Sequence, residues 1–438
     1  MTYYVNTSKS YLFKLSIPIF FSNIAIPLVG LVDTGLMGHL NNIKFLAAIS
    51  IATSVITMIF WSFGFLRMGT VSLVSQSLGR KDYNEIILVF VRNVIIALFF
   101  GLIIIFFKDP IISIIEHFFK TSAETQSLIN KYISIRILSA PAELLIYVLA
   151  GLYLGLQKTF VSSLMISIFC FGNAILSAIL VINFGLEILG VAAGTVIAAY
   201  TAVIIFLIYS YFYLRKKLKI SLTYKNIFNR KKLLMLFNIN FDIFIRTILL
   251  TFSFLWVTYQ SAKLGENYLA VNTLLMQFVM IASFFLDAYA FSTEAIVGFT
   301  IGKRTRKPFF EAVTNSFQLS IFSGLIISLI YLFAARHIIN ELTDLDYLRF
   351  LTFNYIVWIV IIPPIASICY QFDGIFIGAS QTKEMRNGMI LSVVLFIVSS
   401  EFLVNNFGNH GLWLSLLFFM IMRSITLNYY FNTILKKF

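Results

Sequence analysis

The sequence predicts an all-α polytopic membrane protein with twelve transmembrane helices in two parallel-repeat, six-helix lobes around a central cleft. Three observations predict this fold: an apolar composition, twelve apolar runs of membrane-spanning length, and an internal repeat. Of the 438 residues, 59% are hydrophobic and only 12% are charged, and the mean hydropathy is +0.90. A soluble fold has too little interior to bury so much apolar surface.

Twelve apolar runs are long enough to cross a bilayer, which takes about 20 helical residues. Several runs exceed 25 residues, so those helices must tilt or project beyond the bilayer. Short polar connections such as Asn41-Asn42 and Gly408-Asn409 separate neighbouring runs. The expected spans are residues 16–38, 46–78, 86–107, 127–156, 160–183, 189–214, 234–262, 268–300, 310–335, 348–378, 387–405 and 411–434.

The two halves of the chain repeat one another at a constant offset. Four residues in and just after one span recur 223 positions later: Pro141, Gly151, Gly155 and Thr159 as Pro364, Gly374, Gly378 and Thr382. Each half contains six spans, an even number, so the halves cross in the same orientation about an axis along the membrane normal. Two such bundles facing a shared cavity form the architecture of alternating access, which belongs to transporters rather than to enzymes.

Basic residues gather on alternate loops, and the positive-inside rule makes those loops cytoplasmic. Residues 215–232 carry eight basic residues and no acid. Both termini are therefore expected in the cytoplasm, with the chain in the cell (inner) membrane. The expected domains are an N-terminal lobe at 1–214, this basic linker, and a C-terminal lobe at 233–438. Topology and contact with anionic lipid account for the net charge of +14, so nucleic-acid binding is not expected.

The first span contains an acid in an otherwise apolar run. Inserting Asp33 costs about 2.5–3.5 kcal/mol, so such a residue by default marks an ion or proton site that faces protein or water. The alternative is an acid that fixes helix packing through a hydroxyl or a basic partner. Pro27 of the same span removes a helical hydrogen bond and should bend the helix. Pro27, Pro363 and Pro364 are the candidate hinges.

Motifs along essentially the whole chain resemble the multidrug and toxic compound extrusion (MATE) transporters. In the first half these motifs are Val32-Asp33-Thr34, Arg67-Met68-Gly69-Thr70 leading to Gln76, and the series Arg136, Ala140-Pro141, Gly151, Gly155 and Gln157. In the second half, the motifs that resemble the DinF-like branch are Arg246-Thr247, Leu286-Asp287-Ala288-Tyr289-Ala290 with Glu294, Asp373-Gly374, and Glu384-Met385-Arg386-Asn387.

This resemblance implies the two-lobed fold that the family shares with lipid-linked flippases. It also implies that the protein exports amphipathic, often cationic compounds in exchange for inward-moving H⁺ or Na⁺. Beyond that coupling ion, no cofactor and no metal centre is expected. The expected partners are small-molecule substrates and membrane lipid, and the expected state is a monomer.

The resemblance further implies a coupling-ion site in the N-terminal lobe. The family's Asp on the first span, Asn on the fifth and Thr on the sixth fall on Asp33, Asn173 and Thr195. Its second acid falls on Ser177, one helical turn from Asn173. A lone carboxylate attracts cations more weakly than a pair, and when desolvated it can take up a proton, which favours H⁺ but leaves Na⁺ open. Helix–helix hydrogen bonding is the alternative role for Asn173 and Ser177.

In the second half, Asp287 and Glu294 are seven residues apart and share a helical face. Arg246 could neutralise one of them and make it structural, whereas an acid without such a partner would be available to bind substrate or a second proton. Asp373 and Gln76 are assigned to a gate or to helix packing. In the first half, Glu143 is expected to pair locally with the arginine seven residues before it.

Two other classes of function compete with efflux. A membrane enzyme is disfavoured because the spans carry no nucleophile–base or metal constellation. A flippase of the same fold that moves a lipid-linked precursor would need a strongly cationic cavity. The arginines that the spans offer for such a cavity are Arg67, Arg92, Arg136, Arg246 and Arg423. A secondary antiporter for multidrug efflux is therefore favoured.

Overall fold

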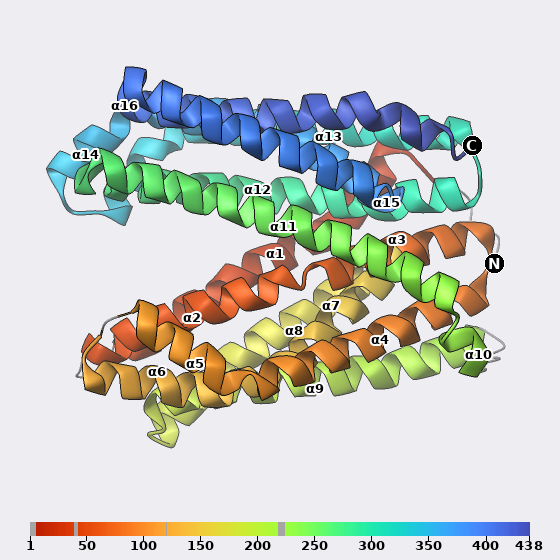
Figure 1. Cartoon of the computed structure of the whole chain (residues 1–438), viewed down its shortest axis with the longest axis horizontal. Coiled ribbons are helices and arrows are strands. Elements are labelled where there is room, and N and C mark those ends of the chain that lie inside the picture. The colour runs from red at the N-terminus through yellow and green to blue at the C-terminus, as the bar shows by residue number, and fades with distance from the viewer. Residues whose placement is uncertain (1–5, 39–42, 120, 218–223) are drawn as a thin grey trace. The chain divides into compact units, whose positions relative to one another are not determined.

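The computed structural model describes residues 6–38, 43–119, 121–217 and 224–438, and its regular structure is helical throughout these ranges (Figure 1). The all-α class is confirmed. Within these described ranges, eleven segments are long and apolar enough to cross a membrane. The expected connection at Asn41-Asn42 and the central part of the linker, 218–223, lie outside the described residues.

The helices of the first half are α1 (Lys9–Gly38), α2 (Ile43–Ser62), α3 (Phe65–Arg80), α4 (Tyr83–Phe106), α5 (Lys108–Phe118), α6 (Ala123–Arg136), α7 (Ala140–Gly155), α8 (Thr159–Ala178) and α9 (Glu187–Lys217). A 3₁₀ turn, η1 (Ile137–Ser139), joins α6 to α7, and a π turn, η2 (Ile179–Asn183), extends α8. The later helices are α10 (Tyr224–Ile227), α11 (Arg230–Leu264), α12 (Glu266–Gly302), α13 (Arg306–Leu342), α14 (Asp346–Phe353), α15 (Ile356–Gly378) and α16 (Thr382–Leu435).

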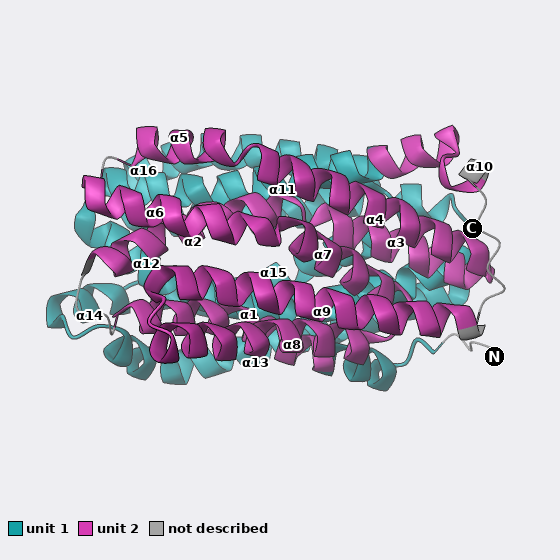
Figure 2. Cartoon of the chain, turned by 90° about the horizontal axis from the view of Figure 1, so that it is seen from below, with its two compact units in different colours: residues 1–17, 238–438 teal, residues 18–237 magenta. Residues whose placement is uncertain are grey.

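The chain divides into two compact units (Figure 2). The N-terminal unit comprises Pro18–Phe237, and the C-terminal unit comprises Met1–Ile17 with Asn238–Phe438. The chain therefore passes between the units inside helices α1 and α11. The sequence placed residues 1–17 in the N-terminal lobe, whereas the structure groups them with the second half of the chain.

Side-chain contacts explain why the start of α1 belongs to the C-terminal unit. The Thr7 hydroxyl donates a hydrogen bond to Glu311 at 3.0 Å, and the Asn315 amide donates one to the Thr7 carbonyl at 2.8 Å. Further along α1, the hydroxyls of Ser16 and Ser292 lie 2.8 Å apart. These bonds tie α1 to α12 and α13 before the helix continues into the other unit.

Several helices break where the backbone ladder is interrupted. Pro141 cannot donate to the carbonyl four residues earlier, and η1 separates α6 from α7 there. Gly408 has φ 56° and ψ −133°, which is not helical, and it breaks α16 into two helices at the connection expected there. Since this kink divides α16 into two crossings, the eleven apolar segments supply the twelve expected spans. The candidate hinges Pro27, Pro363 and Pro364 lie inside helices α1 and α15, which run on through them.

Two short amphipathic helices were not predicted. Helix α5 lies in a segment expected to be a loop, and α14 occupies the start of a span expected over 348–378. With 11 and 8 residues, both are too short to cross a bilayer. Each exposes large apolar side chains, Phe118 on α5 and Phe350 on α14, as expected for helices that lie at a membrane interface.

The internal repeat is preserved in how the helices pack. Gly101 of α4 fits against α7 so closely that a Cβ there would lie 2.5 Å from the Cα of Pro141. Gly324 of α13 fits against α15 in the same way, with 2.9 Å to the Cα of Pro364. Both glycine and proline recur at the 223-residue offset. Close helix crossings in membranes depend on such small residues, so the repeat reflects shared packing in the two lobes.

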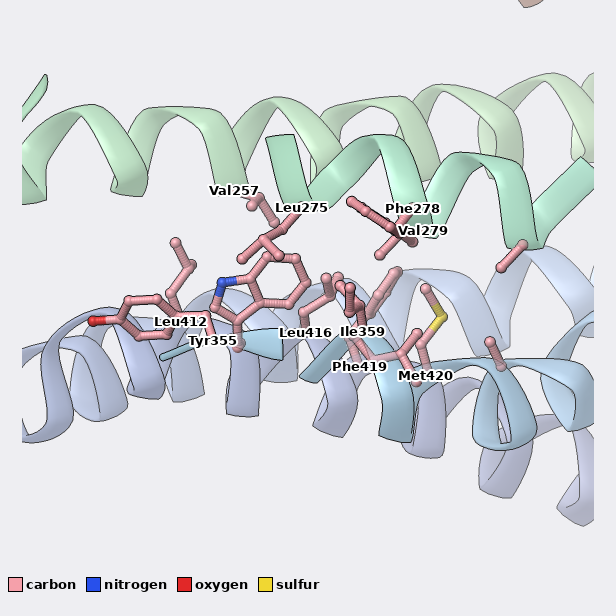
Figure 3. Close-up of a cluster of buried hydrophobic side chains, with 14 of the residues drawn as sticks. Val257, Leu275, Phe278, Val279, Tyr355, Ile359, Leu412, Leu416, Phe419 and Met420 are labelled. Atoms are coloured by element: carbon pink, nitrogen blue, oxygen red, sulfur yellow. The ribbon is translucent and has the colours of Figure 1, made fainter. Parts of the chain in front are cut away.

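The core of the C-terminal unit shows how the kinked end of α16 is held (Figure 3). Residues such as Phe278, Leu416 and Phe419 bury apolar side chains from α12 and α16. Among them the Trp413 indole donates a hydrogen bond to Asn272 Oδ1 at 2.8 Å. The Asn272 amide in turn donates one to Asn409 Oδ1 at 2.7 Å. This polar link fixes the residues that follow the kink against α12.

Candidate functional site

A buried polar cluster lies between α8 and α9 in the N-terminal unit. The Asn173 amide donates to the Thr195 hydroxyl at 2.8 Å, and the Ser177 hydroxyl donates to the Asn173 carbonyl oxygen at 3.2 Å. Asn173 and Ser177 are 0% exposed and Thr195 is 2% exposed. The structure therefore brings together three of the residues assigned to the coupling-ion site, and they satisfy one another's hydrogen bonds.

The close approach of α8 and α9 creates this cluster. A Cβ at Gly194 would lie 2.6 Å from the Ser177 hydroxyl, so only glycine allows the two helices to meet at this point. The Val191 carbonyl also receives hydrogen bonds from the hydroxyls of Thr195, at 3.0 Å, and Ser177, at 3.4 Å. The polar side chains are thus anchored to the backbone of α9.

Asp33 of α1 reaches the same cluster. Its side chain is only 5% exposed and interacts with the Ser177 hydroxyl. Among the described residues, no hydrogen-bond partner is found for its Oδ1 atom. Asp33 also lies close enough to Arg136 of α6 for their opposite charges to attract. The fourth assigned residue therefore joins the other three, and it brings a buried carboxylate oxygen that still has hydrogen-bonding capacity.

Arg136 also forms an ion pair with Glu143, as the sequence suggested. Its guanidinium donates to Glu143 of α7 and to the Ser139 hydroxyl of η1. The turn enforced by the proline after η1 allows the end of α6 to face the start of α7. Sequence reasoning missed Tyr132, which is buried one turn before Arg136 and interacts electrostatically with both Arg136 and Asp33.

A second buried ionic cluster lies in the C-terminal unit. Asp373 of α15 accepts hydrogen bonds through Oδ2 from Arg246 of α11 and from Arg423 of α16, the latter at 2.5 Å. All three side chains are buried. Arg246 therefore has an acidic partner that the sequence did not suggest, and Asp373 takes part in the packing of three helices.

The remaining assigned residues are Glu294, Asp287 and Gln76. Glu294 is buried where α12 meets α15. The two helices are so close there that a Cβ on Gly378 would lie 2.5 Å from the backbone carbonyl oxygen of Glu294. Asp287 lies two turns earlier on α12 and is half-buried. Gln76 is buried on α3. Across the described part of the chain, no three His, Cys, Asp or Glu side chains are grouped as metal ligands.

Four of the five arginines counted within the spans are paired with acids of their own unit. The pairs are Arg92 with Glu85, Arg136 with Glu143, and both Arg246 and Arg423 with Asp373. A further buried acid, Asp242, was missed by sequence reasoning and pairs with Arg386 at 2.6 Å. Because Asp373 is shared by two arginines, the three acids neutralise three of these four guanidiniums and leave one net positive charge in the C-terminal unit.

An all-helical chain with repeated six-span lobes and buried ionisable groups has the features of a polytopic membrane transporter. Solved transporter structures share this fold. VcmN, a MATE transporter of Vibrio cholerae, superposes with a TM-score of 0.87 at 18% identity, over 98% of this chain and 97% of its own. A MOP superfamily transporter from Pyrococcus furiosus superposes with a TM-score of 0.87 at 17% identity, over 98% of this chain and 96% of its own.

Sequence relatives make the assignment specific. The MatE family model matches residues 18–180 and 243–401. DNA damage-inducible protein F of Escherichia coli (strain K12) is 32% identical over 432 residues, covering 97% of this chain and 92% of that protein. Multidrug export protein MepA of Staphylococcus aureus (strain MSSA476) is 23% identical over 406 residues, covering 90% and 89%. The chain belongs to the MatE family of multi-pass membrane transporters.

Proposed function

We propose that this protein is a secondary antiporter that exports amphipathic, often cationic organic compounds in exchange for protons. Asp33 carries the proposal. It is a buried carboxylate on α1 whose Oδ1 has no hydrogen-bond partner among the described residues, and it lies beside the neutral side chains of Asn173, Ser177 and Thr195. A single proton would remove the buried charge and supply a hydrogen to donate.

Coupling follows if the two protonation states of Asp33 favour different conformations. A ligand shifts a conformational equilibrium only by its difference in affinity for the two states. The charged carboxylate prefers a hydrated or cation-bound environment, and the protonated form prefers the dry contact with α8 and α9. Proton entry and substrate release can then alternate across one cycle.

Pairing of the intramembrane arginines supports efflux over the flippase alternative. A flippase for a lipid-linked pyrophosphate needs a strongly cationic cavity, whereas the acids paired with Arg92, Arg136, Arg246 and Arg423 leave only one net positive charge among the four. The proposal includes a monomer in the cell (inner) membrane with both termini cytoplasmic. The basic loops support that orientation.

Transport by purified protein in proteoliposomes tests the proposal. A pH gradient and a Na⁺ gradient are imposed separately, with a fluorescent lipophilic cation as the substrate. The expected result is export driven by the pH gradient and little response to Na⁺. Movement of a lipid-linked precursor without efflux of the cation would favour the flippase. Export driven by Na⁺ alone would overturn proton coupling.

A further inference from the structure

We propose that Arg136 determines the ion selectivity of the Asp33 site: it is a fixed internal cation that keeps sodium out and leaves the site to protons. The inference rests on the proposed antiport and names the residue that sets its coupling ion. Arg136 touches neither substrate nor, in this scheme, the ion itself. It is a specificity-determining residue that acts through Asp33.

The guanidinium of Arg136 is held in place from three elements. Glu143 of α7 and Ser139 of η1 accept its hydrogen bonds. The Ser139 hydroxyl also lies 2.7 Å from Glu143 Oε1, which orients that carboxylate toward the arginine. From α2, the ring of Phe60 faces the guanidinium, with 5.2 Å between its central carbon and the ring centroid. A cation fixed in this way cannot swing aside to make room for a second one.

The groups that act on Asp33 come from two helices. Arg136 and Tyr132 lie on α6, and Ser177 lies on α8, with Glu143 of α7 behind Arg136. With Asp33 ionised, the two carboxylates and one guanidinium carry a net charge of −1, which one monovalent cation neutralises. The charge count alone therefore does not choose between H⁺ and Na⁺.

Two features of the site make that choice. Arg136, rather than the Glu143 behind it, is the charged group that acts on Asp33, so its positive charge weakens the attraction of a cation to that carboxylate in a poorly solvated site. A carboxylate binds a proton covalently and can tolerate that loss, whereas sodium depends on electrostatic attraction and on several oxygen ligands. Those oxygens are already engaged, since Asn173 donates to Thr195 and accepts from Ser177. Sodium would have to share these oxygens with the hydrogen bonds they already accept, in addition to opposing the guanidinium.

Melting of purified full-length protein in detergent tests the inference. NaCl is replaced stepwise by choline chloride at fixed pH and ionic strength. In Arg136→Gln, Asp33 and Glu143 remain as two carboxylates without the guanidinium, so the melting temperature should rise with Na⁺. Wild type and Arg136→Lys, which keeps the charge, should not respond. Adding Asp33→Asn to Arg136→Gln should abolish the Na⁺ effect.

The double variant Arg136→Gln/Glu143→Gln is the second test. It leaves no unpaired Glu143, so it serves as the readout if Arg136→Gln fails to fold. It should respond to Na⁺ by a smaller shift than Arg136→Gln. The inference is overturned if wild type and Arg136→Lys respond to Na⁺ as strongly as the glutamine variants, or if no glutamine variant that folds responds. Melting requires no transport. Failure of proton-driven export would therefore refute the proposed function separately from this result.

Discussion

Two buried aspartates show different ways of placing a carboxylate in a membrane helix. Asp373 accepts hydrogen bonds from two guanidiniums, so its charge is neutralised by fixed partners. Asp33 is next to neutral polar groups and one arginine that is itself bound to Glu143. Fixed pairing suits a structural role, and incomplete pairing suits a group that changes its charge during a cycle. The two residues should therefore respond differently to substitution.

Asp33→Asn should abolish proton-driven export while leaving the protein folded. The amide keeps the shape of the carboxylate but cannot take up a proton. Efflux from proteoliposomes and melting in detergent are the two measurements. Glu401→Gln is the control, since Glu401 is a partly exposed acid that pairs with Lys263 at 3.3 Å and should be dispensable for export. Wild-type export by Asp33→Asn would contradict the assignment.

Asp373→Leu should destabilise the protein more than Arg246→Met. The first change leaves two buried guanidiniums without their shared partner, and loss of one partner of a buried pair costs about 3–5 kcal/mol. The second leaves Asp373 paired with Arg423. Unfolding in detergent of both single variants and of the double variant measures the order and the coupling. Equal and additive losses would show that the three side chains do not act as one cluster.

At the level of helices, the sequence predicted spans better than it predicted their ends and breaks. Long apolar runs identify a span because no other element buries them. The break at Gly408 lies where a connection was expected, whereas helices α5 and α14 were not expected. The contacts that hold such a break in place are tertiary, here the link from Asn272 to Asn409 and Trp413. Such contacts are not visible in local sequence.

Gly101→Ala should lower the free energy of unfolding by about 1–3 kcal/mol, the usual range for overpacking a close contact. Its Cβ would collide with the backbone of Pro141, which cannot move without shifting α7. Gly172→Ala is the matched control, because a Cβ there would lie 3.8 Å from that of Ala198, an ordinary contact. Equal melting temperatures for the two variants would argue against the packing described for α4 and α7.

Across the whole molecule, the repeat preserves helix packing but not charge. Pro141 recurs as Pro364, yet the positions 223 residues before Asp373 and Arg246 hold Ala150 and Asn23. The fold could be predicted because both halves share their apolar pattern and small residues. Asp33 and its neighbours could be assigned from family motifs. The partner of Arg246 could not be predicted, because it depends on which faces of α11, α15 and α16 meet.

The orientation in the membrane gives a prediction for the whole chain. A green fluorescent protein fused after the last residue should fluoresce, and alkaline phosphatase at the same place should be inactive, because the basic loops favour a cytoplasmic C-terminus. The reverse pattern is expected for both reporters fused after Thr343, between α13 and α14. Active phosphatase at the C-terminus would invert the proposed topology.

The contacts at the start of α1 have a consequence for how the protein is made. Thr7 is separated from its partner Glu311 by 304 residues. At synthesis rates of about 5–20 residues per second, roughly 15–60 s pass between the two on the ribosome. The segment that enters the membrane first is therefore among the last to reach its native contacts. A ribosome that stops before α13 would leave this segment undocked, a mark by which quality-control proteases could distinguish unfinished chains from complete ones.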